Sequence, residues 1–229
     1  MNKISLIDGD SSFNVSVCEA ARPLRTVLFA VGAGGNPDRH LPLLESLVGQ
    51  GCAVVAPHFD RMVSLYPSED ELVLRARRLR LALDRVALPS VPVVGVGHSI
   101  GTSLLIAMAG GLMWMREGRQ LPIDPDARLA RLALLAPATG FFQAPHALDS
   151  VRAPILAWAG GLDSITPPAQ AFYLKDVLGD RIPVEVRVVE DAGHFTFMNT
   201  LPPQVVDVMV EREGFLSSLA SDLCRFVMG

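Results

Sequence analysis

The stretch VPVVGVGHSIGTSLLIAMAGG, residues 91 to 111, decides the fold class of this 229-residue chain. It begins with an apolar run typical of a buried strand and ends with an apolar run long enough to begin a helix. Between them, Gly97-His98-Ser99-Ile100-Gly101 places a glycine two positions before and two positions after a serine. Small residues at these places allow a sharp strand-to-helix turn that exposes the serine hydroxyl. The stretch therefore predicts a strand, a tight turn carrying Ser99, and a helix.

Similar apolar segments recur on both sides of this stretch. Strands are predicted at residues 26–32, 52–59, 91–97, 129–137, 153–160 and 184–192. Their nearly continuous apolar character indicates strands that helices cover on both faces. An antiparallel hairpin at residues 3–8 and 13–20 precedes them. Joined by right-handed crossovers, these segments predict the α/β class, a three-layer α/β/α sandwich around a mostly parallel sheet with an N-terminal antiparallel hairpin.

Two helical patterns are well marked. Residues 68–88 open with Ser68 and Glu71 at the spacing of a capping box and carry an apolar stripe. We expect the arginines of this helix, Arg75, Arg78 and Arg85, to lie on a solvated face. Residues 215–227 show a second apolar stripe, so this helix is expected to pack on the sheet.

The composition indicates one domain, residues 1–229, with no separate cap domain. Hydrophobic residues make up 50% of the chain and the mean hydropathy is +0.34, enough for a sizeable core. The net charge is −4 without long runs of one sign, so neither nucleic acid nor a membrane is an expected partner. No leader pattern begins the sequence, and the three cysteines form no CxxC pair. These features favour a cytoplasmic location.

Two further strand ends carry residues of chemical interest. Asp163 follows the strand that ends near Gly160, and His194 follows the last predicted strand. Taken singly, an aspartate in a turn is commonly a capping residue, and a histidine beside aromatic residues is commonly structural. The carboxyl ends of parallel strands meet at one edge of a sheet, so Ser99, Asp163 and His194 are expected to lie together. Asp149, Asp191 and Glu190 are weaker candidates for the acid because of their positions relative to the strands.

Through "GHSIG", "GGLDSITPP" and "DAGHFTF", the chain resembles the α/β-hydrolase superfamily over nearly its full length. The resemblance is to small, lidless serine hydrolases, similar to dienelactone hydrolases and carboxylesterases. It implies cleavage of a small ester or thioester through an acyl-enzyme, with Ser99 as nucleophile, His194 as base and Asp163 orienting the histidine. Serine, where dienelactone hydrolases usually carry cysteine, points to carboxylesterase-type chemistry.

The resemblance also implies an oxyanion hole made of backbone N–H groups. The expected donors are Ile100, directly after the nucleophile, and Ala33 or Gly34 in the loop VGAGGNPDRH. Val31 stands where many members of the superfamily carry histidine, which removes an orienting side chain. Neither glycine-rich stretch has the G-x-G-x-x-G spacing of a dinucleotide-binding loop.

An apolar acyl pocket is expected from Phe141, Phe142 and Phe195, with Phe59 and Tyr66 as further candidates. The histidines form no HxxxH or HExxH pair, so we expect neither a metal nor a cofactor, and the partner is a small-molecule acyl substrate. The oligomeric state stays open. Two alternatives also stay open: a non-catalytic binding protein of the same fold, and an acyltransferase or perhydrolase that uses the same three residues.

Overall fold

The computed structural model describes residues 1–64 and 67–229 and contains one eight-stranded sheet. The strands are β1 (Asn2–Asp8), β2 (Ser11–Cys18), β3 (Arg25–Ala30), β4 (Cys52–Pro57), β5 (Val93–His98), β6 (Leu129–Leu135), β7 (Ile155–Gly160) and β8 (Val184–Val189). Their order across the sheet is β1-β2-β4-β3-β5-β6-β7-β8. Strands β3 to β8 are parallel to one another, whereas β2 pairs antiparallel with both β1 and β4. This confirms the predicted mostly parallel sheet with an antiparallel hairpin at one edge.

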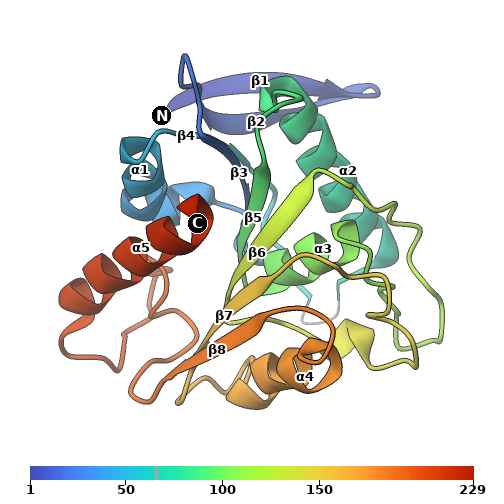
Figure 1. Ribbon diagram of the computed structural model, residues 1–229, viewed down its shortest axis with the longest axis vertical. Coiled ribbons are helices and arrows are strands. Elements are labelled where there is room, and N and C mark those ends of the chain that lie inside the picture. Colours follow the sequence, from blue (N-terminus) through green and yellow to red (C-terminus); the bar gives the residue numbers. More distant parts are fainter. Residues whose placement is uncertain (65–66) are drawn as a thin grey trace.

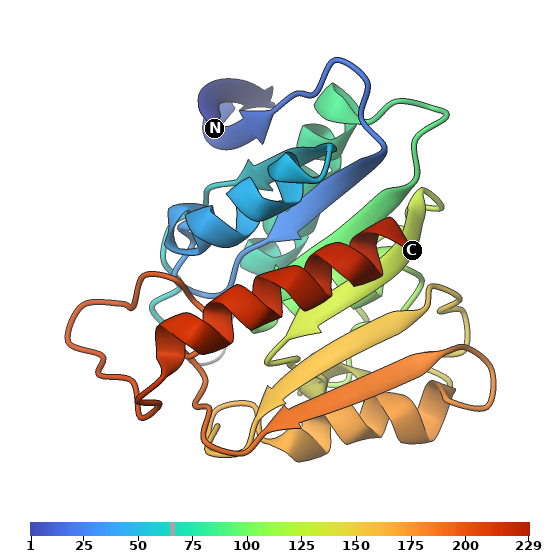
Figure 2. The ribbon, with the colours of Figure 1, turned by 60° about the vertical axis from the view of Figure 1, so that its left-hand side comes forward.

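Helices cover both faces of the sheet (Figure 1). Helices α1 (Leu41–Gly49) and α5 (Arg212–Met228) lie side by side on one face, as Figure 2 also shows. Helices α2 (Glu69–Val86), α3 (Ile100–Met108) and α4 (Pro168–Leu178) lie on the other face. Each face has its own cluster of buried apolar side chains. The molecule is therefore the three-layer α/β/α sandwich that the sequence predicts. Two short 3-10 turns, η1 (Pro37–His40) and η2 (Gly140–Phe142), lie in the loops.

Strand β8 departs from the expectation that every parallel strand is covered on both faces. Its side chains are exposed or half-buried, whereas all six residues of β7, its neighbour, are buried. The strand ends the sheet and pairs only with β7, so less of its surface is packed. Its charged residues, Glu185 and Arg187, occupy positions that a central strand could not tolerate.

Helix α2 begins as predicted with a complete capping box. The Ser68 hydroxyl accepts a hydrogen bond from the Glu71 backbone N–H (3.2 Å), and the Glu71 carboxylate accepts one from the Ser68 backbone N–H (3.1 Å). Helix α3, which follows Ser99, ends at Met108, and residues 112–128 form a loop with one isolated bridge between Trp114 and Gln120. Among the described residues, no helix is long and apolar enough to cross a bilayer.

Candidate active site

Ser99 lies at the turn between β5 and α3, with a backbone conformation of φ 55° and ψ −130°. This left-handed conformation is unusual for any residue other than glycine. The turn is possible because Gly101 has no side chain: a Cβ there would lie 2.1 Å from the Ala30 carbonyl oxygen. The Ser99 side chain is half-buried and its backbone N–H donates to the Leu135 carbonyl (2.9 Å). The local sequence thus presents the hydroxyl at the carboxyl end of the central strand.

His194 lies in the loop after β8 and contacts both Ser99 and Asp163. Its Nε2 atom is 3.0 Å from the Ser99 hydroxyl oxygen, and its Nδ1 atom is 2.8 Å from Asp163 Oδ2. Carboxylate oxygens are acceptors only, so Nδ1 carries a hydrogen in this arrangement and Nε2 is able to accept from the serine in the neutral ring. The structure therefore brings the three predicted residues into one hydrogen-bonded chain.

The loops that carry Asp163 and His194 are joined directly to each other. The Leu162 backbone N–H donates to the Ala192 carbonyl (2.9 Å). Gly160 permits this approach, because a Cβ at that position would lie 2.4 Å from the Ala192 carbonyl oxygen. The edge pairing of β7 with β8 thus continues into the loops beyond them and fixes the acid beside the histidine.

Asp163 is fully surrounded by donors. Its Oδ1 atom accepts from the backbone N–H groups of Ile165 and Thr166, both at 2.8 Å. Its Oδ2 atom accepts from the Thr166 hydroxyl (2.7 Å) as well as from His194. Burial by itself would raise the pKa of Asp163, but the hydrogen bonds and charge of His194, with those from Thr166, hold it below its usual value. The carboxyl group is therefore ionised at neutral pH.

Thr166 is a residue of this site that the sequence analysis missed. Its hydroxyl lies between Asp163 and the His194 ring, 3.1 Å from Nδ1, and also reaches the Ala136 carbonyl (3.2 Å). An aspartate followed three residues later by threonine is a turn pattern, and that spacing was the available signal. The competing acids lie elsewhere. Asp149 binds His146 at the surface (2.8 Å), and Asp191 and Glu190 are exposed.

His98, the residue before the nucleophile, is buried and holds the histidine loop. Its Nε2 atom lies 3.0 Å from the backbone carbonyl oxygen of His194, so Nε2 carries the hydrogen and donates it. Burial, with smaller effects of His194 and His40, keeps the pKa of His98 well below its ordinary value. The ring is thus neutral, and it positions His194 without contacting the Ser99 hydroxyl group.

Of the three predicted N–H donors, Ile100 lies at the elbow, and Ala33 and Gly34 follow Gly32, which contacts the elbow. Ile100 is the first residue of α3, so its N–H has no acceptor within that helix. Gly32 packs directly against the elbow, since a Cβ there would lie 3.2 Å from Ser99 Cβ. Ala33 and Gly34, which follow it, are exposed, and their N–H groups have no acceptor among the described residues. Val31 is buried in the core on the α1 and α5 face.

Arg75 corrects the expectation of a solvated arginine face on α2. Only 3% of this residue is exposed, and its guanidinium donates to the carbonyls of Gly32 (3.1 Å), Ala33 (3.5 Å) and Asp60 (2.6 Å). The position was readable in the sequence. Arg75 is three residues after Leu72 and four before Leu79, so it lies on the buried stripe of the helix. Arg85, in contrast, is exposed as expected.

The predicted aromatic pocket is only partly consistent with the structure. Phe195 is half-buried and meets the His194 ring edge-on at 5.1 Å, and Phe141 is also half-buried. Phe142 has no exposed surface and packs in the core beneath Gly111, so its assignment to a pocket wall was wrong. Phe142 points inward from the η2 turn into the core on the α2, α3 and α4 face, whereas Gly140 and Gln143 are exposed. Phe59 lies under the Arg75 guanidinium at 4.9 Å, and Tyr66 falls outside the described residues.

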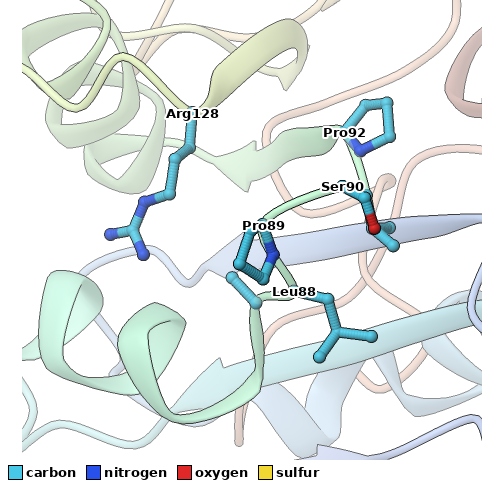
Figure 3. Close-up of a pocket in the computed structure, with 7 residues that line it drawn as sticks. Leu88, Pro89, Ser90, Pro92 and Arg128 are labelled. Atoms are coloured by element: carbon cyan, nitrogen blue, oxygen red, sulfur yellow. The ribbon is translucent and has the colours of Figure 1, made fainter.

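A hollow of about 520 Å³ lies away from these residues, at the amino end of β5. It is lined by residues 87–92 and Arg128, and Figure 3 shows Arg128 extending away from Ser90 and Pro92. The Arg128 guanidinium is held by Asp84 and Asp126, each at 2.6 Å, so its charge is already paired. The candidate active site is therefore at the opposite, carboxyl end of β5, where Ser99 lies.

Comparison with solved structures finds the same architecture in hydrolases. The structure superimposes on a predicted CIB-like hydrolase from Thermoplasma acidophilum with a TM-score of 0.67 and 15% identity, covering 98% of both chains. An esterase from Pyrococcus furiosus gives a TM-score of 0.66 at 14% identity, covering 100% of this chain and 93% of that one. An alpha-beta serine hydrolase homologue from Coxiella burnetii gives 0.64 at 18%, covering 99% and 97%.

Comparisons of the sequence with family models and with curated proteins find no match. At identities of 15%, 14% and 18%, the structural likeness shows the fold. The chain has the α/β-hydrolase fold.

Proposed function

We propose that the protein is a serine hydrolase that cleaves a small ester or thioester through an acyl-enzyme intermediate. The observation that carries the proposal is His194, whose two ring nitrogens lie 3.0 Å from the Ser99 hydroxyl and 2.8 Å from the Asp163 carboxylate. A serine within reach of a histidine that an aspartate orients is the arrangement needed to make a hydroxyl nucleophilic at neutral pH. The structural neighbours described as esterases support the same reaction class.

Acylation begins when the Ser99 oxygen attacks the acyl carbon while His194 Nε2 takes the hydroxyl proton. The C–O bond to Ser99 forms, the carbonyl π electrons move to the oxygen, and the N–H groups of Ile100 and of Ala33 or Gly34 stabilise that charge. Collapse of this intermediate breaks the bond to the leaving alcohol or thiol, which takes the proton from His194. The Asp163 carboxylate stabilises the imidazolium that exists between the two proton transfers.

Deacylation repeats these steps with water in place of the serine. His194 removes one proton from the water, the resulting C–O bond forms the acid product, and the proton returns to Ser99 as the acyl-enzyme bond breaks. Every proton and electron pair in this cycle is handled by the substrate, water and groups of this chain.

The non-catalytic alternative, a binding protein of the same fold, tolerates a mispositioned serine, and the Val31 loop is the sequence feature in its favour. The 3.0 Å between the Ser99 hydroxyl oxygen and His194 Nε2 supports the hydrolase instead. Acyl transfer and perhydrolysis use the same acyl-enzyme and differ only in the acceptor that replaces water, so they are outcomes of a substrate screen.

The nucleophile is tested by replacing Ser99 with alanine. Wild-type protein should turn over p-nitrophenyl butyrate and bind a fluorophosphonate probe covalently, and Ser99→Ala should lose both, because the attacked oxygen is gone. Ser16→Ala is the matched control. Ser16 also contacts a histidine, with 2.7 Å between its hydroxyl and His58 Nε2, but it lies in β2 and should keep wild-type labelling.

The proposal fails if folded wild-type protein takes no label and turns over no ester, or if Ser99→Ala labels as wild type does. A panel of p-nitrophenyl esters and acyl thioesters of increasing chain length, measured with water or an added alcohol as acceptor, then identifies the preferred substrate class.

A further inference from the structure

Arg75 connects α2 with two loops at the site. It donates to the carbonyls of Gly32 and Ala33 in the loop after β3, and to the Asp60 carbonyl in the loop after β4. Within the described residues, its hydrogen bonds all go to backbone carbonyls. A buried cation whose partners are backbone carbonyls holds the backbone in one orientation, because turning a carbonyl away would leave the charge unsatisfied.

The orientation of these carbonyls determines the direction of the neighbouring N–H groups. The chain contains no cis peptide bond among the described residues, and in a trans peptide the C=O and the following N–H point in opposite directions. With the Gly32 carbonyl turned to Arg75, the Ala33 N–H points to the other side of the loop. The Ala33 carbonyl, held by Arg75 and by the Met62 N–H (2.9 Å), turns the Gly34 N–H in the same way.

We propose that Arg75 is a positioning residue for the oxyanion hole: it binds the Gly32 and Ala33 carbonyls and so directs the Ala33 and Gly34 N–H groups toward the acyl oxygen. The inference rests on the proposed hydrolase function. Many members of the superfamily carry an orienting histidine where this chain has Val31. Arg75 takes over that role from helix α2, outside the loop, by binding the carbonyls. Its position against Phe59, at 4.9 Å, keeps the guanidinium plane fixed in this place.

The charge of Arg75 persists in this environment. Burial lowers the pKa of Arg75 to about 10, with Glu71 and Asp60 opposing the shift, so the guanidinium stays protonated at neutral pH. Lysine would keep the charge, but its ammonium group lacks the planar arrangement of donors of a guanidinium, so it would hold fewer of the three carbonyls at once.

Arg75→Met tests the inference, with Arg78→Met as the matched control. Arg78 is on the same helix, stacks on Phe13 at 5.0 Å and binds Asp8 at 3.0 Å, but it contacts neither loop of the site. Removal of a single oxyanion donor costs about 10²–10³ in kcat, so a loosened loop should lower kcat for p-nitrophenyl butyrate by about 10- to 100-fold. KM should stay within about twofold, since the effect belongs to the transition state. Arg78→Met should keep kcat within about twofold of wild type, as expected for a contact outside the site.

Amide hydrogen exchange gives a readout that needs no activity. The Gly35 and Met62 N–H groups donate to the same two carbonyls, at 3.1 and 2.9 Å, so both amides should exchange at least about tenfold faster in Arg75→Met and at the wild-type rate in Arg78→Met. Arg75→Lys should give intermediate values of both kcat and exchange, and it carries the test if Arg75→Met does not fold.

Three results would overturn the inference: unchanged exchange and kcat in a folded Arg75 variant, equal losses in the Arg75 and Arg78 variants, or a loss confined to KM. Inactive wild-type protein would instead reject the hydrolase function, and the exchange rates would still decide whether Arg75 holds the loop.

Discussion

The backbone of Ser99 is strained because its place in the turn requires a positive φ. A non-glycine residue with φ of 55° and ψ of −130° is held in a conformation that costs about 1–3 kcal/mol. The structure maintains it because the Ser99 N–H is fixed to Leu135 and the following turn lies against Ala30. Relaxed geometry at this residue would withdraw the hydroxyl from His194. The backbone conformation that exposes the Ser99 hydroxyl therefore lowers the stability of the folded protein.

This strain predicts that Ser99→Gly is more stable than Ser99→Ala by about 1 kcal/mol in urea unfolding, because glycine adopts positive φ without strain. Ser103, in the regular part of α3, gives the control: there Ser103→Gly should be less stable than Ser103→Ala by about 1 kcal/mol. The same sign of the difference at both positions would show that the turn at Ser99 is not strained.

At the scale of elements, the approach of α3 to β3 depends on one missing side chain. A Cβ at Gly101 would meet the carbonyl oxygens of Ala30 at 2.1 Å and Val31 at 2.8 Å, and both are backbone atoms that cannot turn aside. Helix α3 carries the Ile100 N–H, and β3 leads into the loop of Ala33. The same contact therefore sets the separation of the two sides of the proposed oxyanion hole.

Gly101→Ala should destabilise the protein by about 2 kcal/mol or more, since overpacking of a close backbone contact forces the elements apart. It should also lower kcat for p-nitrophenyl butyrate through displacement of Ile100. Gly49→Ala is the control in α1, where a Cβ meets nothing within 4 Å, and should leave stability equal or higher by up to about 1 kcal/mol. Chemical unfolding and kinetics measure both, and equal stabilities for the two variants would contradict the contact argument.

Across the whole molecule, one sheet is shared by two apolar cores. Helices α2, α3 and α4 pack on one face, and α1 and α5 on the other. All six residues of the central strand β5 are buried, so neither core persists if the sheet opens. The residues of the candidate site come from loops after β3, β5, β7 and β8 at one edge of this sheet. The site therefore depends on the integrity of the entire domain.

This arrangement predicts a single unfolding transition. Trp158, in β7, packs on the α5 side, whereas Trp114 packs against the core on the other face. Urea unfolding followed by tryptophan fluorescence in Trp114→Phe and in Trp158→Phe should give the same midpoint as far-UV circular dichroism of the same variant. Midpoints that differ by probe within a variant would indicate that the two faces unfold separately.

Much of the fold could be predicted because its signals are local. The buried run before Ser99, the glycines around it and the Ser68–Glu71 capping box each act over a few residues, and the structure places a strand, a turn and a helix start there. Chain order and strand ends then placed Asp163 and His194 near Ser99, since parallel strands end at one edge.

The contacts of Thr166, Arg75 and Phe142 were beyond local reasoning, although the spacing from Asp163 and the apolar stripe of α2 gave local signals for Thr166 and Arg75. Each depends on partners distant in sequence: Thr166 on the His194 ring, Arg75 on carbonyls 43 and 15 positions earlier, and Phe142 on space left under Gly111. Sequence alone determined the strands along the chain, the helices at residues 68–88 and 215–227 and the turn at Ser99, because short-range sterics and burial patterns specify them. It identified the three candidate residues through their chain order at the ends of predicted strands. Only the tertiary structure decided which carbonyls Arg75 holds and how closely His194 meets its partners, because those contacts arise when distant loops pack together.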